Sequence, residues 1–217
     1  MNDQPHPPDV SPRPKPQVPP SSCQGKKYMS LKRWSSLWYQ VSLISELQPQ
    51  TVLEIGVGGG VLKAVCQTLG IAVQTADIDP ELTPDFVSSV QRLPLQDQSF
   101  ELTCAFQVLE HVPYSEAIVG FRELCRVSRR HILLSLPNAA RAYPQQLTIP
   151  PLGNVRVTIP GPLRPFPQMI PSHCGEIGRP GTRLRQVIQD LGAETRLVRE
   201  FRVFENPYHH FFQFERR

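Results

Sequence analysis

The sequence predicts an α/β fold built on a doubly wound, mostly parallel sheet that ends in an antiparallel hairpin. Short apolar runs typical of buried strands alternate with helical patterns between residues 51 and 136, as they do in repeated β-α-β units. The run over 131–136 is mostly apolar, which is typical of a strand inside a parallel sheet. The Asn206-Pro207 turn separates the last two strand-like runs and indicates that they pair antiparallel.

The first half of this pattern contains one complete β-α-β unit. An amphipathic helix precedes the unit, and Pro49 closes that helical segment. A glycine turn follows the first strand, Gly70 ends the next helix, and the second strand ends at Asp77. The predicted elements are a helix over 34–47, a strand over 51–55, a helix over 61–69 and a strand over 71–76.

The second half continues the alternation. A turn-like sequence introduces the strand at Phe100, Ser115 is placed to cap the helix that follows, and Gly192 ends the last helix. The predicted elements are strands over 86–90 and 100–106, a helix with its apolar face over 118–125, a strand over 131–136, a helix over 184–191, and strands over 195–204 and 209–215.

Prolines divide the chain into a tail, a domain and an insertion. Residues 1–22 hold eight of the 24 prolines and few large apolar residues. We expect them to form a disordered tail, either a spacer or a docking peptide for a proline-recognising partner. Residues 23–217 are long enough for one domain. Prolines punctuate residues 138–179 within it, and this stretch is expected to be a lid or an unstructured insertion.

Composition excludes several classes of protein. The chain has no run of eighteen apolar residues and lacks the pattern of a secretory signal, so we expect a cytoplasmic protein without a membrane span. The net charge of +4 is scattered along the chain and indicates no nucleic-acid partner. The five cysteines are odd in number and lack CxxC spacing, so free thiols are predicted, and no metal site.

The glycine turn and its two acids form the strongest candidate site. Glycines at 56, 58 and 60 follow a strand and precede a helix, so a ligand can approach backbone N–H groups there. Glu54 is costly in an apolar strand unless a cation such as a ligand ammonium pairs with it. Asp77 lies where an acid accepts hydrogen bonds from ribose hydroxyls. Together they suggest a nucleoside that bears an amino acid.

Three further motifs accompany the glycine turn: DIDP over 77–80, LPLQDQSFE over 93–101 and QVLEHV over 107–112. With them the sequence resembles the class I S-adenosylmethionine-dependent methyltransferases, most closely the type 11 branch. The resemblance covers about residues 26–214. It implies a seven-stranded, Rossmann-like methyltransferase fold with S-adenosyl-L-methionine as its cofactor.

The resemblance also implies roles for individual residues. Asp77 would hold the ribose and Ile78 would pack near adenine. The family often has an acid where this chain has Ser89, so adenine would depend on a serine hydroxyl and on the backbone of Val90. The residues implied to hold the methionine part are Glu54, Gly56, Gly58, Gly60 and Gln107.

The acceptor side is less defined. His111 and His173 are candidate bases because an imidazole titrates near neutral pH. Positions outside the active site explain the two residues equally well: His111 as a histidine at the start of a helix, and His173 as a solvated histidine in a loop. Glu176 lies three residues after His173, in a segment that resembles a histidine-containing loop of some type 11 relatives, and is expected to face the acceptor.

The predicted function is methyl transfer to an oxygen or nitrogen of a small metabolite or glycan. Two alternatives remain at this point. A nicotinamide-dependent oxidoreductase also uses a β-α-β unit and an acid such as Asp77, although Val61 stands where the dinucleotide fingerprint has its third glycine. A non-catalytic binding or adaptor protein would keep the fold and recruit a partner through its tail.

Overall fold

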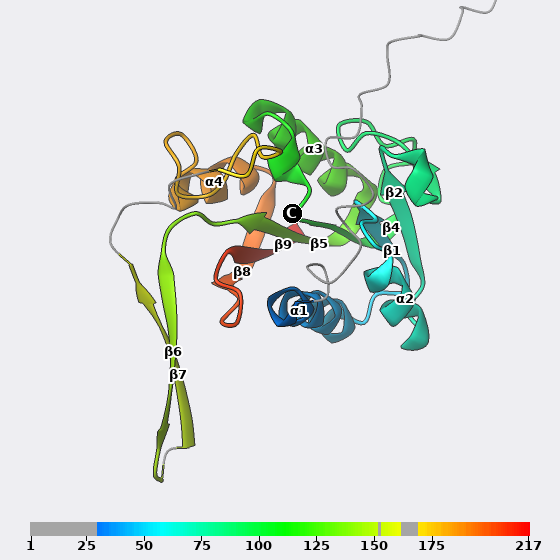
Figure 1. The fold of residues 1–217 in the computed structure, drawn as a ribbon. Helices are drawn as coiled ribbons and strands as arrows, with labels where there is room; N and C mark the ends of the chain where they lie inside the picture. Colours follow the sequence, from blue (N-terminus) through cyan, green and yellow to red (C-terminus); the bar gives the residue numbers. More distant parts are fainter. Residues whose placement is uncertain (1–29, 152, 162–168) are drawn as a thin grey trace, which may run out of the picture.

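The central element is a single seven-stranded sheet (Figure 1). The computed structural model describes residues 30–151, 153–161 and 169–217, and the predicted tail over 1–22 lies outside them. The strand order is β3-β2-β1-β4-β5-β9-β8. The strands are β1 (Val52–Ile55), β2 (Val73–Asp77), β3 (Phe86–Val87), β4 (Phe100–Phe106), β5 (Ser128–Pro137), β8 (Thr195–Arg202) and β9 (His209–Arg216).

Strand directions follow the prediction. The pairs β1–β2, β1–β4, β2–β3 and β4–β5 are all parallel. The last hairpin is antiparallel, because β9 runs against both β5 and β8. The predicted doubly wound sheet with a carboxyl-terminal antiparallel hairpin is therefore confirmed.

Helices cover both faces of the sheet (Figure 1). On β5, Leu133 points to one face, and Ile132 and Leu134 point to the other, as the period of two in a strand requires. Leu133 packs in a core with α1 and α2, whereas the other two pack in a core with α3 and α4. The helices are α1 (Leu31–Leu47), α2 (Val61–Thr68), α3 (Tyr114–Val127) and α4 (Leu184–Leu191), with short 3-10 turns η2 (Pro80–Leu82) and η3 (Leu109–His111). No helix in the described part of the chain is long and apolar enough to cross a membrane.

Several boundaries differ from the prediction. The strand expected over 86–90 is only two residues long. Ser115 lies inside α3 and does not cap it, because Pro113 precedes the helix and its carbonyl already accepts the N–H of Ala117 at 2.9 Å. The strand expected from residue 131 begins at Ser128, three residues earlier.

The stretch over 138–179 contains a hairpin that the sequence did not predict. Strands β6 (Ala142–Ile149) and β7 (Gly153–Pro160) pair antiparallel and project away from the domain (Figure 1). Pro144 interrupts the pattern of β6, whereas polar and apolar residues alternate over 154–159 in β7. Most side chains of both strands are exposed, so this alternation does not reflect burial against the core. The stretch returns to its starting point, since Asn138 and Ile177 form a parallel bridge.

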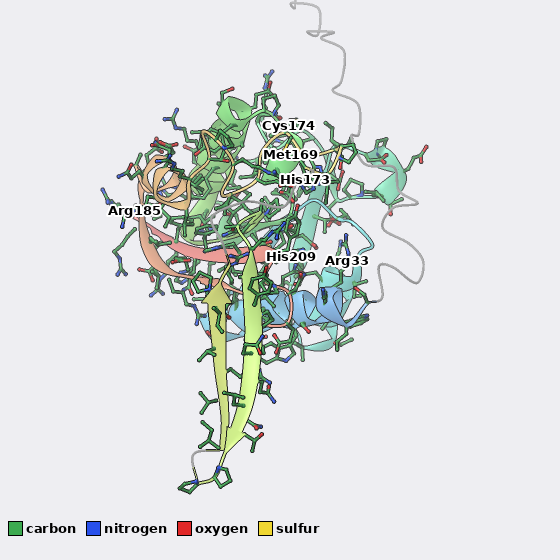
Figure 2. The ribbon with its side chains drawn as sticks, turned by 60° about the vertical axis from the view of Figure 1, so that its left-hand side comes forward. Arg33, Met169, His173, Cys174, Arg185 and His209 are labelled. Atoms are coloured by element: carbon green, nitrogen blue, oxygen red, sulfur yellow. The ribbon has the colours of Figure 1, made fainter. Side chains whose placement is uncertain are left out.

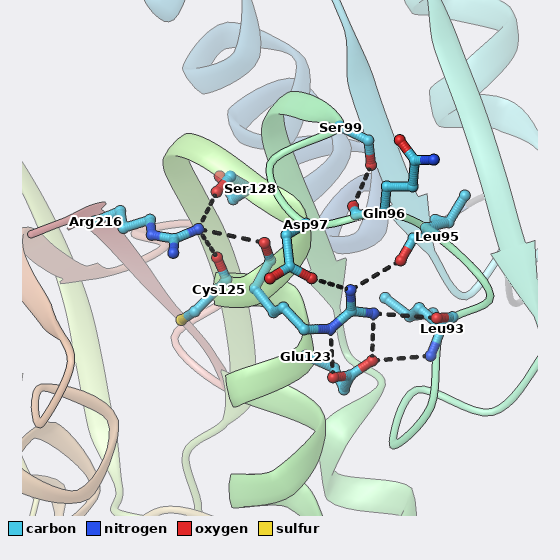
Figure 3. A network of polar contacts seen from close by, with 10 residues as sticks. Leu93, Leu95, Gln96, Asp97, Ser99, Glu123, Cys125, Ser128 and Arg216 are labelled. Atoms are coloured by element: carbon cyan, nitrogen blue, oxygen red, sulfur yellow. Dashed lines mark hydrogen bonds and ion pairs between the residues drawn. The ribbon is translucent and has the colours of Figure 1, made fainter.

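The LPLQDQSFE motif is braced from α3 (Figure 3). The Arg126 guanidinium donates to both carboxylate oxygens of Glu123, and it also donates to Asp97 at 2.6 Å and to the Leu95 carbonyl at 2.8 Å. Glu123 in turn accepts the N–H of Leu93 at 3.0 Å. The Arg126 partner holds the pKa of Glu123 below its usual range, although burial opposes this. These contacts therefore fix the motif, which forms part of the connection between β3 and β4.

Candidate functional site

A cavity of about 750 Å³ opens at the carboxyl ends of β1, β2 and β4, where open α/β sheets bind ligands. Its size falls within the range of small-molecule sites, roughly 300–1,000 Å³. Two predicted site residues, Gly60 and Glu176, do not line this cavity. The predicted residues that do line it are Glu54, Gly56, Gly58, Asp77, Ile78, Ser89, Val90, Gln107, His111 and His173.

The glycine turn passes close to the loop after β4. Gly56 has φ 84°, and a Cβ atom there would lie 2.5 Å from Cγ2 of Val108. Gly60 also has a positive φ, 70°, but a Cβ there would meet nothing within 4 Å. Gly56 is therefore required by both conformation and space, whereas Gly60 is required by the backbone turn that begins α2.

Asp77 is held by backbone donors at the end of β2. Its Oδ2 accepts the N–H of Val57 at 2.8 Å, and its Oδ1 accepts the N–H of Asp79 at 2.9 Å. A carboxylate offers about four lone-pair positions, so each oxygen keeps capacity for another donor. The fixed carboxylate suits a ligand that presents a pair of hydroxyls.

Glu54 is a buried acid at the end of β1. Only 5% of the residue is exposed, and its Oε2 has no hydrogen-bond partner within the described residues. Burial raises its pKa to about 8, although Lys63 acts in the opposite direction. A cationic group placed in the cavity would stabilise the ionised carboxylate.

The predicted adenine end is lined by Ile78, Ser89 and Val90. The Ser89 hydroxyl accepts the N–H of Gln91 at 3.3 Å. The adjacent Ser88 also lines the cavity, and its buried hydroxyl lacks a partner in the described part of the chain. Sequence reasoning did not single out Ser88, because nothing in the motif distinguishes one of two adjacent serines.

Gln107 lies at the end of β4 in a left-handed conformation, with φ 58°. Its backbone N–H donates to the Ser135 carbonyl at 3.0 Å, and its side-chain amide donates to the Ser135 hydroxyl at 3.2 Å. These two contacts anchor Gln107 to β5, so the residue forms a fixed part of the cavity wall.

His111 and His173 lie side by side although they come from distant parts of the chain. The ring of His111 also contacts the carbonyl of Ser172, which is 61 residues away in the sequence. The two histidine rings meet edge to face, with centroids 5.0 Å apart. Figure 2 shows His173 beside Cys174 on the loop before α4, and His209, which lines the same cavity, below it. Burial lowers the pKa of His173, and the nearby His111 adds to this effect, whereas Glu176 opposes it.

Glu176 supports His173 from behind the cavity wall. Its Oε1 lies 3.1 Å from Nδ1 of His173 and accepts the Tyr208 hydroxyl at 2.6 Å, while Oε2 accepts from Arg179 at 2.9 Å. Burial would raise the pKa of this carboxyl, but the three hydrogen bonds lower it below its usual value. Glu176 therefore acts through His173, and the sequence expectation that it faces the acceptor is not what this geometry supports.

Glu110 is a site residue that sequence reasoning missed. It belongs to the QVLEHV motif, is 3% exposed, and lines the cavity. Its Oε2 has no partner within the described residues. Burial raises its pKa to about 8. The signal that could have found it is a carboxylate directly before a candidate histidine.

Comparisons with known proteins agree with this geometry. Residues 53–134, less than half of the chain, match the family model of the methyltransferase domain, in its type 11 branch. No curated protein matches the chain.

Solved structures resemble the whole chain at low sequence identity. A Pyrococcus horikoshii OT3 protein has a TM-score of 0.60 and 14% identity, covering 93% of this chain and 97% of its own. Magnesium protoporphyrin IX methyltransferase from Synechocystis PCC 6803, solved with bound S-adenosylmethionine, has a TM-score of 0.59 and 15% identity, covering 89% and 86%.

A third structure matches almost end to end. The 1,6-didemethyltoxoflavin-N1-methyltransferase from Burkholderia thailandensis, solved with bound 1,6-didemethyltoxoflavin and S-adenosylhomocysteine, has a TM-score of 0.56 and 14% identity, covering 98% of this chain and 99% of its own. The chain therefore has the fold of the class I S-adenosylmethionine-dependent methyltransferases, and residues 53–134 match the family model of a methyltransferase domain.

Proposed function

We propose that this protein transfers a methyl group from S-adenosyl-L-methionine to an oxygen or nitrogen of a small metabolite or glycan. The observation that carries the proposal is the fixed Asp77 carboxylate beside the glycine turn, at the mouth of a cavity of about 750 Å³. The domain match and the solved structures with bound cofactor support the same chemistry.

The residues of the cavity fit this cofactor. S-Adenosylmethionine carries an amino acid at one end and a ribose and adenine at the other. The buried, unpartnered carboxylate of Glu54 suits the ammonium, and Asp77 suits the ribose hydroxyls. Ile78 and Val90 offer apolar contact to adenine, while the Ser88 hydroxyl offers it a donor or acceptor.

The chain itself contributes the position of the acceptor. The bound cofactor supplies an electrophilic methyl group on a sulfonium, so holding the acceptor in line with it accounts for much of the acceleration. His111 and His173 line the cavity, and we assign them to its acceptor side, where the acceptor proton must leave. Glu176 orients the His173 ring.

Calorimetric titration with S-adenosylmethionine and S-adenosylhomocysteine, beside NADH, tests the proposal. We expect both sulfur compounds to bind one to one and NADH not to bind. Binding of NADH alone would favour an oxidoreductase. No binding by folded protein would refute the cofactor assignment, and binding without turnover across a panel of hydroxyl and amine acceptors would favour the non-catalytic alternative.

A further inference from the structure

Three metal-ligating side chains meet on the acceptor side of the cavity. One potential ligand atom from each of Glu110, His111 and His173 lies within 4.8 Å of the other two. All three residues line the cavity. The contacts between segments fix this meeting, because the N–H of Cys174 donates to the Glu110 carbonyl at 2.6 Å.

Hydrogen bonds define which nitrogen of each imidazole is available. Nδ1 of His111 lies 2.9 Å from the Ser172 carbonyl, which can only accept, so this nitrogen carries the proton. Nδ1 of His173 lies 3.1 Å from the Glu176 carboxylate, which likewise accepts. In the neutral rings both Nε2 atoms therefore keep their lone pairs. An outer acceptor on the second ring nitrogen is the usual support of a metal-bound histidine.

Glu110 supplies the charge of such a site. Its carboxyl is nearly fully buried, and its Oε2 has no partner within the described residues. A buried carboxylate is stabilised when it pairs with a cation or coordinates a metal. The neighbouring Glu176 is already neutralised by Arg179, so Glu110 is the carboxylate that lacks compensation in this cluster.

We infer that Glu110, His111 and His173 bind one divalent transition-metal ion, with Zn²⁺ as the ion that best fits. Two imidazoles and one carboxylate are a common ligand set for zinc in sites that keep an open position for water or substrate. Mg²⁺ and Ca²⁺ prefer sites made of oxygen ligands. The Ser172 carbonyl and Glu176 are then positioning groups for the two histidines.

The metal would also narrow the class of acceptor, a step that rests on the proposed function. Because all three ligand residues line the cavity, an open position on the metal would suit a hydroxyl of the acceptor, whose pKa a bound metal lowers. The acceptor proton passes to solvent, the oxygen lone pair forms the new bond to the methyl carbon, and the carbon–sulfur bond breaks with its electrons kept by sulfur. The imidazoles hold the metal in this arrangement and do not take the proton.

Zinc titration of the chelator-treated full-length protein tests this inference. We expect one Zn²⁺ per chain, and Co²⁺ in its place should give the visible absorption of a low-coordinate site. Glu110→Gln and His173→Ala should abolish this binding. Glu176→Gln, which changes only a positioning residue, should weaken it about 10–100-fold. Cys174→Ser is the matched control, because its exposed thiol adjoins His173 without belonging to the cluster, and it should bind as wild type does.

The outcomes separate this inference from the proposed function. Titration with S-adenosylhomocysteine is run on the same samples, and circular dichroism confirms that each variant is folded, with His173→Asn replacing His173→Ala if that variant unfolds. Folded wild type that binds S-adenosylhomocysteine but not Zn²⁺ overturns the metal site alone. Zn²⁺ binding that survives both ligand substitutions, or that Cys174→Ser removes, overturns it too. Zn²⁺ binding without cofactor binding supports the site and refutes the proposed function.

Discussion

The two ends of the cavity are built in different ways. The cofactor end comes from neighbouring β-α-β segments, and backbone N–H groups of Val57 and Asp79 hold its central carboxylate. The acceptor end joins the loop after β4 to the loop before α4, and its contacts involve side chains such as those of His173 and Glu176. The first end is thus specified by a local motif, and the second depends on how distant segments pack.

This difference predicts how substitutions act. Changes at the cofactor end should weaken nucleoside binding without affecting the acceptor cluster. Changes at the acceptor end should leave nucleoside binding intact. The experiments below test that separation, in order of decreasing effect.

Asp77→Ala should give the largest effect. It removes hydrogen bonds to a charged group, each worth about 1.5–3 kcal/mol, so affinity for S-adenosylhomocysteine should fall by about 100-fold or more. Zn²⁺ binding should not change. Calorimetry measures both, and Asp97→Asn, an exposed acid outside the cavity, is the control. Equal loss of both ligands would show that the two ends are not separate.

Gly56→Ala and Gly60→Ala form a matched pair within one turn. Both place a side chain at positive φ, which costs about 1–2 kcal/mol, but only Gly56→Ala also meets Val108. We expect Gly60→Ala to lower the melting temperature by several degrees and Gly56→Ala to lower it further, with about tenfold weaker cofactor binding. Thermal unfolding with and without S-adenosylhomocysteine measures both effects. Indistinguishable variants would contradict the close approach of the two loops.

The buried Glu54 should make cofactor binding depend on pH. Its pKa is about 8 in the empty protein, so the carboxyl is protonated at pH 6, and an incoming ammonium must ionise it. Affinity for S-adenosylhomocysteine should therefore rise with pH from about 6 to 8, by up to about tenfold per unit, with release of up to one proton. Titrations in buffers of different ionisation heat count that proton. Glu54→Gln should weaken binding and remove the pH dependence; a dependence that survives in Glu54→Gln assigns it elsewhere.

Stability should show the opposite pH trend. A carboxyl whose pKa is raised by folding keeps its proton up to a higher pH in the folded chain than in the unfolded chain. The free energy of unfolding therefore falls as pH rises from about 5 to 8. Glu110, with a pKa of about 8, should contribute to this loss. The metal-free Glu110→Gln variant should therefore gain melting temperature over wild type at pH 8 more than at pH 5. An unchanged difference would show that Glu110 is not protonated in the empty protein.

Shortening the β6–β7 hairpin should have the smallest effect on the cavity. We expect replacement of residues 146–156 by Asn-Gly to leave the affinity for S-adenosylhomocysteine unchanged within about twofold, because none of the described residues in this range lines the cavity. Acceptor turnover by the shortened protein then tests the lid hypothesis for residues 138–179. Unchanged turnover would argue against a lid role for the hairpin.

The sequence predicted the sheet, and most of the residues that it assigned to the cofactor line one cavity, for the same physical reason. The period of the hydrophobic pattern and the residue types of turns are local features of the sequence. The glycine turn, Asp77 and the alternation of elements could therefore be recognised without knowing the packing. The acceptor end could not be predicted as fully. Nothing in the sequence indicates that Glu176 would be engaged by Tyr208 and Arg179.

Two other failures share this cause. Residues 154–159 of the hairpin within 138–179 do alternate between polar and apolar, but neither strand has a buried face, and the surrounding prolines favoured an insertion. Glu110 belongs to the QVLEHV motif, but it becomes a candidate ligand because it is buried beside two histidines that come from different segments. Long-range packing, and not residue type, makes it a candidate ligand.

The bridge between Asn138 and Ile177 has a consequence for how this protein can vary. The chain leaves the end of β5 at Asn138 and returns beside it at Ile177, so the residues between them form a loop whose two ends are held together. The entropy of closing such a loop rises only slowly with its length, by about 0.6 kcal/mol per doubling. The part of this loop farthest from the bridge can therefore be lengthened, shortened or exchanged for a foreign domain at little cost in folding free energy. Its carboxyl-terminal end keeps His173 and Glu176 in place.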